Sequence, residues 1–210
     1  MEAHQMGARE ADVAPASDAV AGRSAGAWVP ANPAPLGLAG FAMTTFVLSV
    51  FNANLVSSSG EGVVLGLAIA YGGLAQLLAG MWEFRTGNTF GAVAFSSFGA
   101  FWISFYVLAH TSPAVAPKYV AIYLYAWGIF TGYMFLASLR TTGAVALVFA
   151  LLTATFFLLA IGAAGAHTNV TKIGGWVGLA TAIAAWYASF AQVINSTFGR
   201  TVLPLVPLAR

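Results

Sequence analysis

Residues 89–109 read TFGAVAFSSFGAFWISFYVLA, a run of 21 residues in which no side chain carries a charge. A helix needs about 20 mostly apolar residues to cross the roughly 30 Å hydrocarbon core of a bilayer. A strand that spans a membrane would instead show shorter segments of alternating polarity. The stretch therefore predicts a transmembrane helix.

Five further segments share this length and apolar character. Across the chain, 60% of the residues are hydrophobic and 7% are charged, with a mean hydropathy of +0.83, whereas soluble domains carry roughly 25% charged residues. The sequence thus predicts an all-α membrane protein with six transmembrane helices. The helices are expected at about 36–56, 62–82, 89–110, 117–138, 142–164 and 174–197.

The two ends of the chain differ from this hydrophobic body. Residues 1–31 hold four of the six acidic residues and no long apolar run, a composition typical of disordered segments. This segment also lacks the basic start and apolar centre of a signal peptide. We expect a disordered tail at 1–31, with a folded regulatory element as the alternative, a six-helix transmembrane domain at 32–204 and a short C-terminal tail at 205–210.

The basic residues give the predicted orientation. The side of the six expected spans that holds both termini carries Arg9, Arg23, Arg85, Arg140, Arg200 and Arg210. The other side carries Lys118 and Lys172. Because basic residues favour the cytoplasmic side, we expect a multi-pass protein of the cell (inner) membrane with both termini in the cytoplasm.

An arginine–threonine pair recurs at the ends of three spans. The pairs begin at Arg85, Arg140 and Arg200, which are 55 and 60 residues apart. We interpret each out-and-back pair of helices as one unit used three times, although arginine is common at membrane boundaries in any case. Some transporters consist of parallel repeats around an axis along the membrane normal. The predicted fold is therefore three helical hairpins around a central pore.

The middle of each expected span contains no charged residue. Glu61 lies in an outer turn and Glu83 lies near the end of the second span, whereas ion sites and proton relays usually place acids or bases inside the membrane. His4, His110 and His167 form no cluster with acids for metal binding or acid–base catalysis, and the chain has no cysteine. We therefore expect no enzymatic activity, no metal or other cofactor and no nucleic-acid partner.

Neutral polar side chains do occur within the expected spans. They can hydrogen-bond a small solute that sheds water, or they can bond between helices, which is worth ~0.6 kcal/mol on average. Both uses stay open, and amides are the harder groups to satisfy in lipid. The candidates for the lining of a pathway are Thr44, Thr45, Asn52, Gln76, Thr131 and Gln192.

The segment before the first span reads Asn32-Pro33-Ala34-Pro35-Leu36-Gly37-Leu38. Proline suits the first turn of a helix and an asparagine can cap it, so a helix start near Pro35 is predicted. This motif, in particular Asn32, Pro33, Pro35 and Gly37, resembles the signature of the acetate uptake transporter family, also called succinate–acetate permeases. Tyr71–Gln76, Gly87–Gly91 and Phe198–Pro204 are similar to further motifs of that family.

The resemblance covers roughly residues 32–204 and carries expectations of its own. It implies a six-helix subunit in a homohexamer, with a pore in each subunit for acetate and sometimes succinate. It also implies an apolar constriction at Phe41, Phe98 and Leu152, where the family often has tyrosine in place of Phe98. Transport by a channel and transport by a proton-coupled permease both stay open.

Two other functions are compatible with the same residues. One is a channel for a small neutral solute such as urea or ammonia, and the other is a membrane sensor that does not transport and signals through the N-terminal tail.

Overall fold

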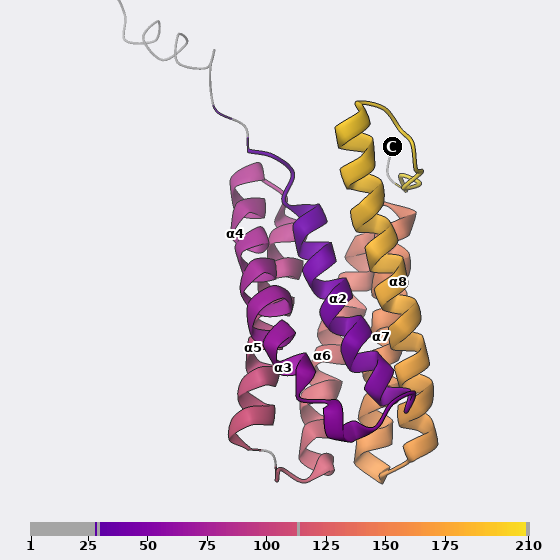
Figure 1. Cartoon of the computed structure of the whole chain (residues 1–210). Coiled ribbons are helices and arrows are strands. Elements are labelled where there is room, and N and C mark those ends of the chain that lie inside the picture. Colours follow the sequence, from indigo (N-terminus) through magenta and orange to yellow (C-terminus); the bar gives the residue numbers. More distant parts are fainter. Residues whose placement is uncertain (1–27, 29, 113, 209–210) are drawn as a thin grey trace, which may run out of the picture. The chain divides into compact units, whose positions relative to one another are not determined.

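The computed structural model describes residues 28, 30–112 and 114–208. Six helical spans in this part of the chain are long and apolar enough to cross a membrane (Figure 1), which confirms the all-α prediction. The helices are α2 (Ala34–Asn52), α3 (Val63–Ile69), the π-helical turn η2 (Ala70–Ala75), α4 (Gln76–Thr86), α5 (Thr89–Thr111), α6 (Pro117–Ser138), α7 (Gly143–Gly165) and α8 (Thr168–Phe198), with a short 3-10 turn η1 (Ser58–Gly60). The second span is the continuous run of α3, η2 and α4.

The expected tail at residues 1–31 lies outside the described residues, apart from Trp28, Pro30 and Ala31. The structure also places two helix boundaries differently from the hydropathy pattern. The first helix ends at Asn52 instead of near residue 56, because Asn54 adopts a left-handed φ of 57°, a conformation in which asparagine is enriched. The last helix begins at Thr168 instead of near residue 174. α8 therefore has about one and a half extra turns at its N-terminal end, before the apolar segment starts.

The first helix packs closely against the last, and the other close helix pairs are neighbours in sequence. α2 lies along α8, α4 lies along α5, and α7 packs against both α6 and α8 (Figure 1). α5 and α6 are consecutive but make little contact with each other. The first and last helices are thus closer partners than α5 and α6, which form one of the predicted out-and-back hairpins.

The π-helical turn brings the second span close to α5. Gly72 and Gly73 are buried in η2, and a Cβ atom at Gly72 would lie 2.9 Å from Cδ1 of Trp102. A side chain at this position would push the indole ring away, so glycine allows the contact. The contact fixes the position of Trp102 on α5.

A buried carboxyl group joins α4 to α5. Glu83 is 1% exposed, and its Oε2 accepts hydrogen bonds from Nδ2 of Asn88 at 2.9 Å and from Oγ1 of Thr86 at 3.2 Å. Oδ1 of Asn88 in turn accepts from the backbone N–H of Gly91 at 3.1 Å and caps α5. Glu83 therefore secures the turn between the two helices.

The segment after α8 returns to the start of α7. The N–H of Gly143 donates to the carbonyl of Val206 at 2.7 Å, and the N–H of Leu208 donates to the carbonyl of Thr141 at 3.0 Å. These bonds attach the last described residues to the turn between α6 and α7. The start of α2 and the end of α8 lie at this same end of the bundle (Figure 1).

Candidate functional site

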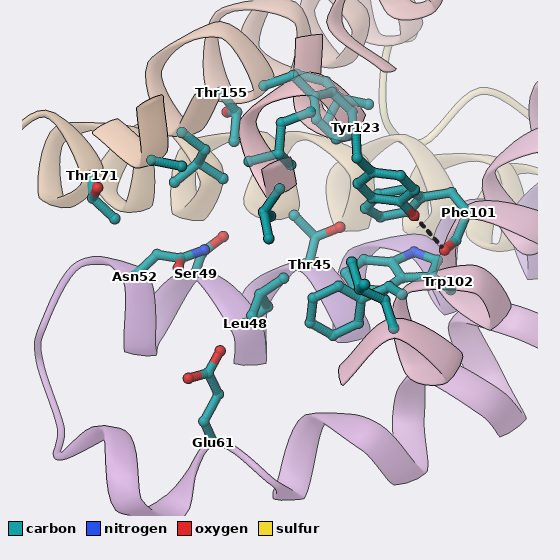
Figure 2. A pocket seen from close by; sticks show the side chains of 18 of the residues that line it. Thr45, Leu48, Ser49, Asn52, Glu61, Phe101, Trp102, Tyr123, Thr155 and Thr171 are labelled. Atoms are coloured by element: carbon teal, nitrogen blue, oxygen red, sulfur yellow. Dashed lines mark hydrogen bonds between the residues drawn. The ribbon is translucent and has the colours of Figure 1, made fainter. Parts of the chain in front are cut away.

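A cavity opens at the end of the bundle that carries η1, and we call it the loop-side cavity. Its volume is about 250 Å³, room for several water molecules at about 30 Å³ each. Side chains from α2, α5, α6, α7 and α8 line it, and most of them are aromatic or aliphatic (Figure 2). Its polar and charged lining includes Thr45, Ser49, Asn52, Glu61, Thr155 and Thr171.

A second cavity lies at the opposite end of the bundle, and we call it the terminus-side cavity. Its volume is about 220 Å³. The start of α2, the start of α5 and the start of α7 form much of its wall, together with the segment after α8. Its lining includes Ala34, Asn88, Thr142, Gln192 and Leu205.

α2, α5, α7 and α8 contribute to both cavities, and the first three of these helices pass from one lining to the other at a single level. The last terminus-side and first loop-side residues are Leu38 and Phe41 on α2, Phe95 and Phe101 on α5, and Phe149 and Leu152 on α7. Phe98 lies between the two cavities on α5. The level that separates the two linings thus coincides with the three residues for which the resemblance implies a constriction.

Phe41, Phe98 and Leu152 are closely packed at this level. Their side chains are 4%, 3% and 4% exposed, respectively, and the rings of Phe41 and Phe98 lie 5.7 Å apart between centroids. Apolar side chains offer no hydrogen bonds in place of water, so a hydrated solute would lose its water here at a large cost in free energy. The arrangement suits a gate, and the role of the three residues as a gate stays a prediction.

Phe98 also belongs to an aromatic cluster. Its ring contacts five other rings, with centroid distances from 5.5 to 6.5 Å, on Phe41, Trp127, Phe130, Phe149 and Phe156. Aromatic pairs are worth ≈ 0.5–1.5 kcal/mol each beyond their buried area. Phe98 therefore contributes to the packing of the bundle as well as to the constriction.

The polar residues that we expected in a pathway divide into two groups. Thr45 and Asn52 line the loop-side cavity and Gln192 lines the terminus-side cavity. The rest lie away from both cavities: Oγ1 of Thr44 donates to the carbonyl of Gly40 at 2.9 Å and Oγ1 of Thr131 to that of Trp127 at 2.7 Å. Gln76 is 1% exposed within the protein and its Oε1 has no hydrogen-bond partner. The hydroxyls of Thr44 and Thr131 thus bond within their own helices, to the carbonyl four residues earlier.

Two hydrogen-bonding groups at the wall of the loop-side cavity have no partner. Oγ1 of Thr45 and Nε1 of Trp102 are buried without one, and both residues line the cavity (Figure 2). An indole N–H only donates, and a buried group left unpaired costs ≈ 1–3 kcal/mol. Both groups are therefore unpaired donors that lie beside the cavity but are themselves buried.

Trp102 was not among the residues that the sequence placed in a pathway. Its spacing gave a usable signal, since Trp102 lies four residues after Phe98 and therefore on the same face of α5. Ser49 and Thr155, which line the cavity on α2 and α7, also lay outside the six candidates for the lining of a pathway.

The Asn32 motif fixes the start of α2 against α8. Oδ1 of Asn32 accepts from the N–H of Ala34 at 3.0 Å, and its Nδ2 donates to Oε1 of Gln192 at 2.9 Å. The helix begins at Ala34 with Pro35 in its first turn, as the sequence predicts. Because Gln192 lines the terminus-side cavity, the motif positions one part of the cavity wall.

The other residues of the motif support the same contact. Pro33 directly precedes the helix, and Oγ of Ser189 on α8 donates to the carbonyl of Pro35 at 2.7 Å. A Cβ atom at Gly37 would lie 2.6 Å from the ring of Phe95, so this glycine lets α2 approach α5 closely.

One acidic residue that the sequence placed in an outer turn lines the loop-side cavity. Glu61 directly follows η1, and burial raises the pKa of its carboxyl group above the ordinary value. Hydropathy gives no sign that this turn lies against the cavity. Among the described residues, no three His, Asp or Glu side chains are grouped as metal ligands.

Comparison with known proteins adds sequence and structural relatives. The chain is 40% identical over 180 residues to the "Succinate-acetate/proton symporter SatP" of Escherichia coli K12, which covers 83% of this chain and 95% of that protein. It is 40% identical over 195 residues to "Acetate permease A" of Emericella nidulans, with coverage of 83% and 65%. The solved "Structure of the bacterial acetate channel SatP" superposes with a TM-score of 0.81 at 40% identity and covers 84% of this chain and 99% of that chain.

These relatives match the chain over nearly its whole six-helix part, and they confirm the family that the motifs predicted. The profile of one family, described as the GPR1/FUN34/yaaH family, matches residues 24–210. The chain therefore belongs to the GPR1/FUN34/yaaH family.

Proposed function

We propose that this multi-pass membrane protein conducts acetate, and with it succinate and other small carboxylates, across the membrane. The observation that carries the proposal is the succession of two cavities along α2, α5 and α7: Phe41 and Leu152 line the loop-side cavity, and Phe98, which lines neither, stands between the two linings on α5. The transported acids named in the titles of the relatives support the choice of solute. Those titles describe transport, and we propose no enzymatic activity for this chain.

A small carboxylate fits the chemistry of the pathway. Thr45 and Trp102 offer unpaired donors to carboxylate oxygens in the loop-side cavity. The apolar constriction opposes the passage of hydrated ions, because they would lose water without gaining a compensating charge. A carboxylic acid with a pKa near 4 is uncharged in about one molecule per thousand at neutral pH. The uncharged acid loses less hydration free energy at the apolar constriction than the anion does, so the two forms meet barriers of different height.

Transport is tested with the purified protein in liposomes. We expect labelled acetate to enter faster than labelled succinate, and labelled urea to enter no faster than in liposomes without protein. A pH-sensitive dye inside the liposomes reports whether protons accompany acetate, which separates a proton-coupled permease from a channel for the anion. Urea entry that exceeds acetate entry, or acetate entry equal to that of empty liposomes, would contradict the proposal.

The same assay separates transport from signalling. Deletion of residues 1–30 removes the tail and leaves Asn32 and the six helices intact. Acetate uptake should survive this deletion, whereas complete loss of uptake with a normal amount of protein would favour a sensor that acts through its tail.

We propose that both termini lie in the cytoplasm, which places the loop-side cavity outside. The basic residues support this orientation, since most of them fall on the side of the termini. A cysteine substituted for Lys118 or Lys172 should react with a reagent that does not cross membranes when it is added to intact cells, and one substituted for Arg140 should not. The reverse labelling pattern would rule out the orientation.

We further propose a homohexamer with one pathway in each subunit. The family resemblance supports this number, and the two cavities and the constriction consist of residues from a single chain. Light scattering from the detergent-solubilised protein measures the mass, and a stable monomer that transports acetate would contradict the assembly.

A further inference from the structure

The loop-side cavity contains a negative group where the proposed solute is itself negative. Among the described residues that line this cavity, Glu61 alone carries a formal charge. Its carboxyl group extends from the turn after η1 toward the end of α2, where Leu48, Ser49 and Asn52 line the cavity (Figure 2). No lysine, arginine or histidine among these lining residues offsets the charge.

The titratable groups around the cavity lie on α5, α6 and α8 and at the residue before α8. α2, α3 and α7 contain no titratable side chain between their bounds. The titratable groups toward this end of the other helices are Tyr106, His110, Lys118, Tyr119, Tyr123, His167 and Lys172. Of these, Tyr123 lines the cavity, and its phenol is uncharged at neutral pH.

Two carboxylates in one small cavity repel each other, and the repulsion grows as water is excluded. A single proton shared by the two groups removes the repulsion and adds a hydrogen bond, so one of two neighbouring carboxyl groups holds a proton more firmly. Burial raises the pKa of Glu61 above its ordinary value, which widens the pH range over which Glu61 keeps its proton.

We propose that Glu61 admits a carboxylate to the loop-side cavity only together with one proton. The pair is either a protonated solute beside an ionised Glu61 or an ionised solute beside a protonated Glu61, and each pair carries one negative charge. When the solute leaves as the acid, the O–H bond goes with it and Glu61 remains a carboxylate that takes its next proton from water. The inference rests on the proposed transport of carboxylates and names the ionisation state in which they enter.

The test measures exchange of labelled acetate by the protein in liposomes that have the same pH on both sides, so that the orientation of the inserted protein does not matter. Below the pKa of Glu61 the side chain is neutral and resembles glutamine, and above it the side chain repels acetate. We expect Glu61→Gln and wild type to exchange acetate at similar rates at pH 4, which lies below the ordinary pKa of a glutamate carboxyl group. At pH 8 the variant should be faster by about threefold, because Glu61 is exposed and water screens part of the repulsion between the two charges.

Two control variants make the result specific. Glu61→Asp keeps an acid in the cavity and should retain the steep pH dependence of wild type. Glu83→Gln replaces the acid at the α4–α5 turn, which lines neither cavity, and keeps an oxygen that accepts the hydrogen bond from Asn88; its pH dependence should also match wild type. If Glu61→Gln unfolds, Glu61→Ala carries the same expectation.

Three results would overturn the inference. The first is a pH profile of Glu61→Gln parallel to that of wild type, and the second is a flattened profile in Glu83→Gln. The third is uptake of labelled methylammonium by wild type that disappears in Glu61→Gln, which would make the cavity a site for cations. Absence of acetate exchange by wild type at every pH would instead contradict the proposed function itself.

Discussion

Replacement of Leu152 by alanine should let larger acids through the pathway while acetate still passes. The side chain is 4% exposed and lines the loop-side cavity at the end nearer to the terminus-side cavity. Removal of its branched end leaves a gap beside Phe41 and Phe98 through which a longer chain can fit. We expect the ratio of succinate to acetate uptake to rise about tenfold, which corresponds to about 1.4 kcal/mol in the relative barriers.

A matched leucine separates a gate from ordinary packing. Leu179 on α8 is 8% exposed and lines none of the cavities described above. Both Leu152→Ala and Leu179→Ala should lower the free energy of unfolding by about 2–5 kcal/mol, since each removes a buried leucine side chain. The ratio of succinate to acetate uptake should change in Leu152→Ala alone. Equal ratios in the two variants would show that Leu152 only packs.

Phe98→Ala should change the ratio in the same direction with a larger loss of folded protein. Its ring contacts five others, and truncation of a buried phenylalanine costs about 3–5 kcal/mol. For this reason Leu152 is the cleaner position at which to test the constriction.

Gly175→Ala should be among the most destabilising single substitutions in the bundle. A Cβ atom at Gly175 would lie 2.5 Å from the carbonyl carbon of Asn52 and 2.6 Å from Cα of Ala53. These are backbone atoms at the end of α2, so no side chain can rotate away and the two helices must separate. Overpacking of this kind costs about 1–3 kcal/mol and sometimes more, and we expect a melting temperature several degrees lower in detergent.

The control for this substitution is Gly66→Ala. Gly66 lies in α3, and a Cβ atom there would meet nothing within 4 Å. Alanine is favoured over glycine inside a helix by about 0.5–1 kcal/mol, so the melting temperature should stay the same or rise slightly. Size-exclusion chromatography after heating measures both variants. A Gly175→Ala protein that survives heating as well as wild type would show that α2 and α8 can move apart at little cost.

The number of helices follows from the sequence because each span is a long uncharged run, which a bilayer accepts only as a helix. The boundaries follow less well. Asn52 and Asn54 end α2 through a turn that hydropathy does not register, and the polar residues at the start of α8 remain helical beyond the apolar run. Hydropathy measures the affinity of a segment for lipid, and it does not report where hydrogen bonding within the helix stops.

The site was harder to predict than the fold. Thr44 and Thr45 are neighbours with the same side chain, yet Thr45 lines the loop-side cavity and Thr44 bonds to its own helix. Successive residues point about 100° apart around a helix axis, and a helix that is apolar all round gives no sign of which direction is inward. Phe41, Phe98 and Leu152 were predicted from the family resemblance. The resemblance indicates which positions on the helices face a common pore, and composition does not.

The pairing of α2 with α8 also determines when the cavities can form during biosynthesis. A ribosome delivers α2 to the membrane before any other of these helices and α8 after all of them. Both cavities take part of their wall from α8, through Thr171 at one end and Gln192 at the other. The nascent chain therefore has no closed conduit until its final membrane segment arrives, and until then lipid or a chaperone must cover the face of α2 that α8 later covers.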